Sequence, residues 1–392
     1  MRILHITPYY YPAWGYGGPV RVVYEIATRQ AARGHSVTVL TTDALDAHSR
    51  APAGRHLIDG VEVVRCPNLN NALAWRRLFA PIGFGRHLRR LAPAFDVAHL
   101  HEARSLLNAL ALPVLLRHYI PYIVSPQGGL PIELGRTAYK RVFDAVVGKR
   151  LLTHAARLHA LTPIERDQYT PFGVSPDQIV MIPNGIDPAA FDNPADIAGF
   201  KQAHDIPADA PVVGFVGRLN VIKGVDFLVD AFASIRDRHP DAVLMLVGPD
   251  DGLRPALEAQ IARLGIGEAV RFVGYVGGSA EKAAAYRTAD VYILPSRYEI
   301  FGITVLEALL NGVPTIVTER CGLAEELLGE GLVRVVPFGN ITALGAEIAA
   351  VLEPPPAQPG RAEYGQQYIA AHFGWDILTE RWLDAYQQCL SA

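Results

Sequence analysis

The chain has 392 residues, of which 50% are hydrophobic and 19% charged, with a formal net charge of −3. This length predicts two domains of ordinary size, and the lack of any run of eighteen apolar residues excludes a membrane-spanning helix. The three cysteines lie far apart, which excludes a disulfide framework or a zinc site. The opening residues MRILHITPYYYP are typical of a buried strand rather than of a secretion signal, so we expect a cytoplasmic protein.

Charge is distributed unevenly along the chain. Residues 1–190 carry 21 Lys and Arg against 13 Asp and Glu, whereas residues 191–392 carry 15 against 26. Two interpretations stay open: ordinary variation between two domains, or a first half that faces an anionic acceptor or surface. No nucleic-acid partner is expected.

Short β-branched runs alternate with longer helical patterns throughout the first half. Strands are predicted at 2–7, 36–42, 61–66, 96–101, 121–126 and 157–162, with helices between them. This alternation predicts right-handed βαβ units and a parallel sheet with helices on both faces. Residues 1–190 therefore form a first doubly wound domain.

A second series of the same kind follows a stretch of linker composition at 183–210. Its strands are predicted at 212–217, 242–248, 270–274, 290–295, 314–318 and 332–337. They define a second domain over 205–372, so the predicted fold class is α/β with two Rossmann-like, doubly wound parallel-sheet domains. Residues 375–392 form an amphipathic helix that need not belong to the domain it follows.

The most informative segment follows the fourth strand of the second domain. Ligands of open parallel sheets bind beyond the carboxyl ends of the strands. Here Glu299 lies in the turn, Gly302 allows close approach, and a helix is predicted to start near Ile303. The N–H groups from Gly302 to Thr304 would face a phosphate. Glu307 lies among apolar neighbours and needs hydrogen-bond donors, for which vicinal ribose hydroxyls are suitable; the alternative is a solvated carboxylate near a helix start.

Two cations follow the first strand of the same domain. In GRLNVIKG, Arg218 and Lys223 lie between glycines that admit close approach, and their two charges suit a diphosphate. An ordinary basic turn is the alternative. No two aspartates are separated by a single residue, so the Asp-x-Asp device that holds a metal–diphosphate is absent. We therefore expect neither a metal nor another cofactor.

The first domain offers weaker candidates. Gly17 and Gly18 precede a predicted helix, but the loop before them is too long for the tight turn of a dinucleotide fingerprint, which argues against a nicotinamide site. Gln127 and Gly128 follow another strand and offer an amide side chain and accessible backbone.

The segment HLHE places two histidines, His99 and His101, on one predicted strand. We expect only one of them to face a given side of the sheet, and a structural role is favoured over a catalytic one.

In combination, these segments resemble the family-four retaining glycosyltransferases of the GT-B fold. SRYEIFGITVLEAL and GRLNVIKG carry the resemblance, which extends over nearly the whole chain through SPQGGLP, IPNGID, FVGYV, CGLAEE and WDILTERWLDAY. It implies two facing Rossmann-like domains, the first on the acceptor side and the second on the donor side, with the C-terminal helix crossing back to the first. It also implies transfer of a hexose from a nucleotide-diphosphate donor to a carbohydrate or lipid-linked acceptor, in bacterial polysaccharide or glycolipid assembly.

The resemblance assigns roles to individual residues. Arg218 and Lys223 hold the diphosphate, Glu299 meets the sugar and phosphate, and Glu307 holds the ribose. The other donor-binding residues that it implies are Gly17, Gly18, Gln127, Gly128, Val273, Tyr275, Phe301, Gly302, Ile303 and Thr304. Many relatives have a histidine where Gln127 stands; glutamine cannot exchange protons near neutral pH, which removes the basis for a proton-transfer role there.

Retention without an evident protein nucleophile indicates front-face substitution, in which the departing phosphate takes the proton of the acceptor hydroxyl. Two other enzyme classes stay open. A nucleotide-sugar epimerase shares the fold and would form product without an acceptor, whereas a nicotinamide-dependent oxidoreductase would need the tight glycine turn.

The basic residues of the first half concentrate in two segments, 75–91 and 135–152. The first places Arg76, Arg77, Arg86, Arg89 and Arg90 among Trp75, Leu78, Phe79, Phe84 and Leu88, and the second contains Arg136, Lys140, Arg141, Lys149 and Arg150. Such surfaces suit anionic lipid headgroups, which predicts peripheral contact with the inner face of the membrane. The alternative is a pair of solvated amphipathic helices whose apolar faces are core.

Overall fold

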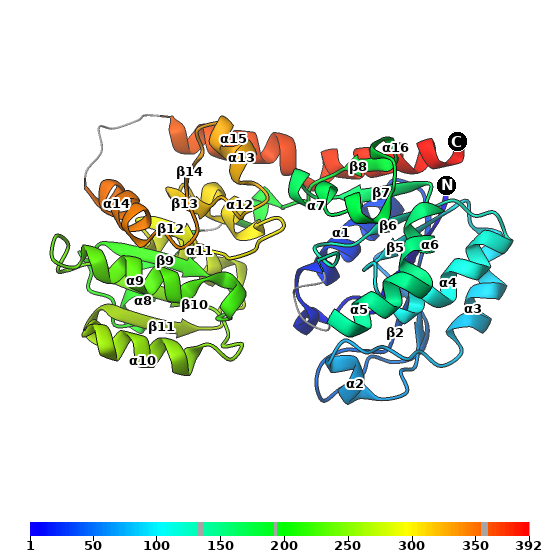
Figure 1. Ribbon diagram of the computed structural model, residues 1–392, viewed down its shortest axis with the longest axis horizontal. Coiled ribbons are helices and arrows are strands. Elements are labelled where there is room, and N and C mark those ends of the chain that lie inside the picture. Colours follow the sequence, from blue (N-terminus) through cyan, green and yellow to red (C-terminus); the bar gives the residue numbers. More distant parts are fainter. Residues whose placement is uncertain (132–136, 192–193, 354–359, 392) are drawn as a thin grey trace. The chain divides into compact units, whose positions relative to one another are not determined.

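The computed structural model describes residues 1–131, 137–191, 194–353 and 360–391 (Figure 1). It divides into two compact units: unit 1 comprises Met1–Gly185 and Trp375–Ala392, and unit 2 comprises Ile186–Gly374. Each contains one sheet that is parallel throughout or nearly so. The structure therefore confirms the α/β class with two Rossmann-like domains.

Unit 1 is built on an eight-stranded sheet of order β3-β4-β2-β1-β5-β6-β7-β8. Every pair is parallel except β3 with β4. The strands are β1 (Arg2–Ile6), β2 (Ser36–Thr42), β3 (Gly54–Ile58), β4 (Val61–Cys66), β5 (Val97–His101), β6 (Tyr122–Ser125), β7 (Arg157–Ala160) and β8 (Ile179–Met181). Strand order reverses between β1 and β5, which makes their carboxyl ends the expected place for a ligand.

Helices cover both faces of this sheet. They are α1 (Gly18–Ala32), α2 (Asn71–Trp75), α3 (Phe84–Leu91), α4 (Leu106–Arg117), α5 (Thr137–Phe143), the π-helix η3 (Asp144–Gly148), α6 (Lys149–Thr153), α7 (Pro163–Asp167) and α16 (Trp375–Ser391), with short 3-10 turns η1 (Trp14–Tyr16), η2 (Ala92–Ala94), η4 (Thr170–Phe172) and η5 (Pro176–Gln178). Local sequence explains several boundaries. Ser105 accepts a hydrogen bond from the N–H of Asn108 at the start of α4, and Gly34, with φ 84°, follows the end of α1.

The C-terminal helix α16, red in Figure 1, completes the core of unit 1 on one face of the sheet. Its buried residues are Trp375, Leu378, Trp382, Ala385, Tyr386 and Cys389, and they pack with Val22 and Ile26 of α1 over Ile3, Val97 and Ile123 of the strands. The opposite face carries a separate core formed with α3, α4 and α6.

Unit 2 has a six-stranded, all-parallel sheet of order β11-β10-β9-β12-β13-β14. Its strands are β9 (Val212–Val216), β10 (Val243–Val247), β11 (Val270–Gly274), β12 (Val291–Leu294), β13 (Thr315–Thr318) and β14 (Val333–Val336). Its helices are α8 (Ile197–Ala203), α9 (Val225–Ile235), α10 (Arg254–Leu264), α11 (Ser279–Thr288), α12 (Ile303–Leu310), α13 (Ala324–Gly329), α14 (Ile341–Leu352) and α15 (Arg361–Phe373), with 3-10 turns η6 (Pro188–Phe191), η7 (Val221–Lys223) and η8 (Gly267–Ala269).

The stretch of linker composition at 183–210 is more ordered than its sequence suggests. Asp196 accepts a hydrogen bond from the N–H of Gly199 and thereby starts α8, and Phe200 of this helix is buried. One cap and one apolar anchor are enough to make a short helix when a neighbouring surface receives it. In this case α8 packs against α11.

No helix among the described residues is both long and apolar enough to cross a lipid bilayer.

Candidate active site

The carboxyl ends of β9 and β12 lie side by side in unit 2. Strand order reverses between these two strands, and ligands of open α/β sheets bind at such a switch point. The segment with Arg218 and Lys223 follows β9, and the segment with Glu299 follows β12. A Cβ placed on Gly224, whose φ is 66°, would lie 2.1 Å from the carbonyl oxygen of Pro295, so the two segments pack backbone to backbone.

Lys223 and Glu299 meet in an ion pair between Nζ and Oε2. Their side chains are 21% and 15% exposed, so the pair is largely shielded from solvent. The side chain of Asn220 accepts a hydrogen bond from the backbone N–H of Lys223 at 3.2 Å and thereby caps the 3-10 turn η7. The N–H of Glu299 donates to the carbonyl of Arg320 at 3.1 Å, which fixes the backbone that carries the carboxylate.

Helix α12 starts directly after Gly302, as the sequence predicts, and this glycine has a φ of 96°. A Cβ there would lie 2.9 Å from Sγ of Cys321 and 3.3 Å from Leu294, so glycine is required for both conformation and space. Phe301 is buried, and Ile303 and Thr304 are half-buried. The first N–H groups of α12 have no intrahelical partner, which makes this end of the helix suited to an anion.

Glu307 lies one turn further along α12 and is 5% exposed. Its carboxylate forms an ion pair with Lys282 and accepts a hydrogen bond from the hydroxyl of Tyr286 at 2.7 Å. Both partners are on α11. The sequence does not reveal these two partners, because a lysine and a tyrosine four residues apart on a helix show no link to Glu307 until the position of α12 is known.

The remaining donor-side candidates lie at the margin of this arrangement. Arg218 is 62% exposed and pairs with Asp251 at 2.8 Å rather than with Glu299. Val273 is half-buried at the end of β11, and Tyr275, just beyond it, is 75% exposed. The guanidinium of Arg254 lies 4.7 Å from the ring centroid of Phe272 on the same strand.

In unit 1, the candidates lie beyond the carboxyl ends of β1 and β6. Gly17 has a φ of 93° and begins α1 together with Gly18, and a Cβ on either glycine would meet no atom within 4 Å. Gln127 and Gly128 both have positive φ, 48° and 81°. The N–H of Gly128 donates to Glu165, whose pKa burial raises to about 7.

Two further residues of unit 1 escaped sequence analysis as a site, Arg77 and Glu102. Both have left-handed backbones, with φ of 62° and 61°, and such strain in residues other than glycine gathers at functional sites. Arg77 donates to the hydroxyl of Tyr9 at 2.9 Å and to the carbonyl of Tyr16 at 2.7 Å, and lies 3.4 Å from the carboxylate of Glu102. Burial raises the pKa of Glu102 to about 7. Their signal is conformational, so the sequence alone does not display it.

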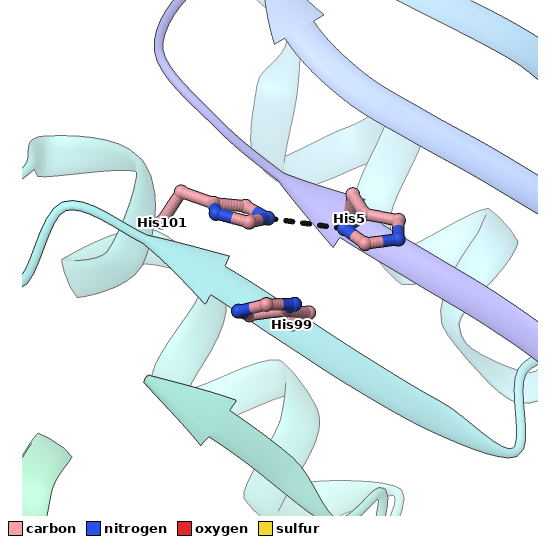
Figure 2. A group of neighbouring side chains, drawn as sticks. All are labelled: His5, His99 and His101. Carbon is pink, nitrogen blue, oxygen red and sulfur yellow. Dashed lines mark hydrogen bonds between the residues drawn. The ribbon is translucent and has the colours of Figure 1, made fainter. Parts of the chain in front are cut away.

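The prediction that only one of His99 and His101 faces a given side of the sheet was wrong. His99 and His101 lie on the same side of the sheet, together with His5 of β1 (Figure 2), because side chains two residues apart in a strand share a face. One ring nitrogen from each lies within 4.8 Å of the others, and all three residues are buried. This is the spacing of a possible three-histidine metal site.

Hydrogen bonds account for this cluster without an ion. Oε1 of Gln30 can only accept, so His5 donates from Nε2 at 2.8 Å and its Nδ1 accepts from Nε2 of His101 at 3.0 Å. The amide of Gln30 donates to Tyr386, whose hydroxyl then donates to Nδ1 of His99 at 2.7 Å.

Nε2 of His99 is left to donate to Oγ of Ser125 at 2.6 Å. Nδ1 of His101 has no partner among the described residues. Because Nε2 carries the proton of this ring, Nδ1 has no hydrogen, and no N–H group of His101 is left without an acceptor. All three rings are neutral in this arrangement, and burial lowers the pKa of each below its usual value.

The two basic segments of unit 1 differ in where their apolar residues lie. In 75–91, Phe79, Phe84 and Leu88 are buried core, whereas Trp75 and Leu78 are exposed. The helix that runs through α5, η3 and α6 instead exposes an apolar stripe, defined by Tyr139 (42% exposed), Val142 (64%) and Val146 (72%), at helical spacing. Arg141, Lys149 and Arg150 are exposed on the same helix. Arg136 lies outside the described residues.

Two family models match the chain, one in each half. "Glycosyl transferase 4-like domain" matches residues 17–185, and "Glycosyl transferases group 1" matches residues 196–368. Together they cover the sheet of unit 2, the sheet of unit 1 apart from β1, and both of the segments that follow β9 and β12.

The chain is also similar to characterised proteins over its whole length. It is 29% identical to a glycogen synthase of Mycobacterium tuberculosis, covering 98% of this chain and 94% of that one. It is 29% identical to a D-inositol 3-phosphate glycosyltransferase of Actinosynnema mirum, covering 98% and 95%. Among solved structures, HepE of Anabaena in complex with UDP and glucose superposes with a TM-score of 0.75 at 21% identity, covering 99% of each chain.

Proposed function

Because this chain belongs to the family-four glycosyltransferases of the GT-B fold, we propose that it transfers a hexose from a nucleotide-diphosphate donor to a hydroxyl acceptor with retention of anomeric configuration. One observation carries the donor side of the proposal. The Lys223–Glu299 pair, the start of α12 and Glu307 all lie at the carboxyl ends of the two central strands of one sheet.

In the proposed complex, the diphosphate replaces the carboxylates of Glu299 and Asp251 as the partner of the two cations. Lys223 turns from Glu299, and Arg218 from Asp251, toward the phosphate oxygens, while the first N–H groups of α12 donate to the same anion. Glu299 is then free to accept hydrogen bonds from the sugar, and Glu307 from the ribose. Val273 and Tyr275 contact the base, and Gly17, Gly18, Gln127 and Gly128 contact the sugar.

The chemical step is a front-face substitution. The oxygen of the acceptor hydroxyl forms a bond to the anomeric carbon while the bond from that carbon to the phosphate oxygen breaks. The hydroxyl proton passes to the departing phosphate oxygen. Negative charge grows on the diphosphate, so Lys223 and Arg218 stabilise the transition state more than the bound substrate.

Unit 1 is proposed to bind the acceptor. Glu102 can accept hydrogen bonds from acceptor hydroxyls, and Arg77 can hold a phosphate or other anion on the acceptor, since its guanidinium is already fixed by Tyr9 and Tyr16. A relative named for a phosphorylated acceptor, D-inositol 3-phosphate, is compatible with a cation at this place. An acceptor of a polysaccharide or glycolipid pathway fits the same chemistry.

Stereochemistry tests the proposed reaction. A thermal-shift screen of UDP-, ADP- and GDP-sugars first identifies the donor, since a bound ligand stabilises by mass action. Proton NMR of early product from an α-linked donor should then show an axial anomeric product. An inverted anomer would contradict the mechanism, and a new sugar formed without acceptor would identify an epimerase instead.

The apolar stripe and its cations support a further part of the proposal, contact with an anionic membrane. Three exposed apolar side chains on one face of a helix, beside exposed Arg141, Lys149 and Arg150, suit the boundary between headgroups and acyl chains. Each cation near such a surface contributes about 1 kcal/mol. The docked surface is therefore proposed to be α5–η3–α6, with the exposed arginines of α3 as additional contacts.

Vesicle co-sedimentation tests this contact. The chain should bind vesicles containing phosphatidylglycerol, bind neutral vesicles weakly, and lose binding in Val142→Asp and in Arg141→Glu. Leu57→Asp is a matched control, because Leu57 is an exposed apolar residue (78%) on strand β3. No binding even at low salt would contradict the proposal.

A further inference from the structure

The carboxylate of Glu307 is held at both oxygens by α11. Lys282 forms an ion pair with Oε1, and the hydroxyl of Tyr286, one turn along the same helix, donates to Oε2 at 2.7 Å. The side chain of Glu307 is 7% exposed and that of Lys282 is 30% exposed. The carboxylate is thus almost closed off from water, while the ammonium that neutralises it still reaches the surface.

These two partners act differently on the carboxylate. Burial raises the pKa of Tyr286 well above its usual value, so its hydroxyl is a fixed donor at neutral pH. Lys282 supplies a full counter-charge, and a buried carboxylate without one is costly to ionise. Tyr286 therefore orients Glu307, whereas Lys282 keeps it ionised.

Glu165 of unit 1 shows what happens to a buried glutamate that has hydrogen-bond donors but, among the described residues, no cation as a partner. It is fully buried and accepts hydrogen bonds from the N–H groups of Gly128 and Leu161. Burial nevertheless raises its pKa to about 7. Among the residues that the structure describes, Tyr286 is the one neutral donor to the carboxylate of Glu307. Loss of the Lys282 ammonium should therefore leave the Glu307 carboxylate without a counter-charge and favour its protonated form.

We propose that Lys282 is a positioning residue for the donor nucleoside: it keeps Glu307 ionised, and so able to accept hydrogen bonds from both ribose hydroxyls, throughout the neutral pH range. Each carboxylate oxygen has two acceptor sites, so Lys282 and Tyr286 leave one site on each oxygen for a ribose hydroxyl. The inference rests on the proposed function, because that function gives Glu307 its ribose.

The other groups around Glu307 come from the neighbouring elements and are a tyrosine, a glutamine and a glutamate. Tyr292 of β12 lies close enough for the charge of Glu307 to act on it, and burial raises the pKa of Tyr292 well above its usual value. Helix α15 also packs on α12, where its Gln366 donates to the carbonyl of Leu310 at 2.9 Å. Glu299 pairs with Lys223 in the free protein. Within the described part of unit 2, Lys282 is the cation paired with Glu307.

The pH dependence of donor binding tests the role of Lys282. UDP-glucose, or the nucleotide-diphosphate glucose that the thermal-shift screen selects, is titrated calorimetrically at pH 6, 7 and 8; neither of its phosphates titrates in this range. The wild-type Kd should change little with pH. Lys282→Met should bind several-fold more weakly at pH 6 than at pH 8, since a buried carboxyl that has lost its counter-charge takes up a proton more readily.

Rescue and coupling separate this role from a structural one. Lys282→Arg should restore a flat profile, and Lys201→Met, a lysine of α8, should behave as the wild type. In a Glu307→Gln background, Lys282→Met should add no pH dependence, because the titrating group is gone. Lys282→Gln carries the same expectation should the methionine variant fold poorly.

The outcomes distinguish this inference from the function on which it rests. A wild-type protein that binds no nucleotide-diphosphate sugar would contradict the proposed function. A wild-type protein that binds the donor, combined with a flat profile for Lys282→Met, would overturn the role of Lys282 alone.

Discussion

The central strands of the two sheets carry polar groups of opposite kinds. In unit 1, β1 and β5 present three neutral histidines inside the sheet, closed by hydrogen bonds to Gln30, Tyr386 and Ser125. In unit 2, the strands themselves are apolar, and the charges lie in the loops and helix beyond them, paired as Lys223–Glu299 and Lys282–Glu307.

This difference separates what holds the fold from what can serve a ligand. An imidazole buried between sheet and helix exchanges its partners only when the core opens. The Lys223–Glu299 pair lies beyond the strand ends and can release its lysine to a phosphate without opening the core, because the Lys223 side chain is 21% exposed. The comparison predicts that changes in unit 2 alter kinetics and binding, whereas changes in the histidine cluster alter stability.

The largest expected effect is on turnover. Lys223→Ala should lower kcat by about 30- to 1,000-fold, since one charge-assisted contact to a transition-state anion contributes about 2–4 kcal/mol. Arg218→Ala should have a smaller effect, because Arg218 is 62% exposed. Steady-state kinetics with Arg263→Ala, an exposed residue of α10, as the control measure both. A near-native kcat for Lys223→Ala would contradict the proposed role of Lys223 of unit 2 in stabilising the transition state.

Acid should destabilise unit 1 through its histidines. Burial lowers the pKa of His5 and of His159 from 6.5 to about 4. The unfolded chain therefore binds these protons first as pH falls, so stability is complete above about pH 6.5 and is lost progressively between there and about pH 4. Each such histidine contributes on the order of 3 kcal/mol across that window.

Tryptophan fluorescence measures this loss selectively, because Trp14, Trp75, Trp375 and Trp382 are all in unit 1. Urea unfolding at pH 7.5 and pH 5 should show a lower midpoint at pH 5, and His5→Asn should be less stable at pH 7.5 but lose less on acidification. Equal midpoints at the two pH values would show that the cluster is not neutral in the folded protein.

Glu307→Gln should weaken donor binding by about 10- to 100-fold, since hydrogen bonds to a charged group contribute about 1.5–3 kcal/mol. Its kcat at saturating donor should change less, because the ribose is remote from the bond that breaks. Calorimetric titration compares it with Glu258→Gln, an exposed glutamate of α10. A loss confined to kcat would move Glu307 from the ribose to the reacting bond.

The smallest expected effect is that of metal removal, which should change neither transfer nor stability. The donor site offers two cations and a helix N-terminus for the diphosphate, and hydrogen bonds already engage both ring nitrogens of His5 and of His99 and Nε2 of His101. Initial rates and unfolding midpoints are compared with and without excess EDTA. Loss of activity that magnesium or manganese restores would contradict the proposed roles of Arg218 and Lys223.

The sequence predicts the strands of both sheets except β3 and β8, and the start of α12, because those depend on local patterns. Alternating β-branched runs mark the strands, and the glycine at 302 permits the turn into a helix. Lys282 and Tyr286 could not be found in this way, since their partner Glu307 lies on another helix and only tertiary packing brings the two helices together. Arg77 and Glu102 are recognised by backbone strain, which has no signature in residue type.

The error over His99 and His101 has a different origin. Their spacing of two residues already places both on one face of a strand, so the sequence contained the answer. The sequence could not show which side chains form hydrogen bonds with the histidine cluster, because Tyr386 comes from the last helix of the chain and Gln30 from the first long one.

The membership of α16 in unit 1 bears on how the chain is made. A ribosome releases β1 to β8 first, then all of unit 2, and α16 last, so the face of the first sheet that α16 covers stays open while the second sheet is being synthesised. That open face includes Ile3, Val97 and the ring of His99, whose Nδ1 has not yet received its hydrogen bond from Tyr386 of α16. Unit 2 is continuous in sequence and can fold as soon as it emerges. The domain that is synthesised first is thus the one that is finished last, and during that interval part of its core stays exposed to water.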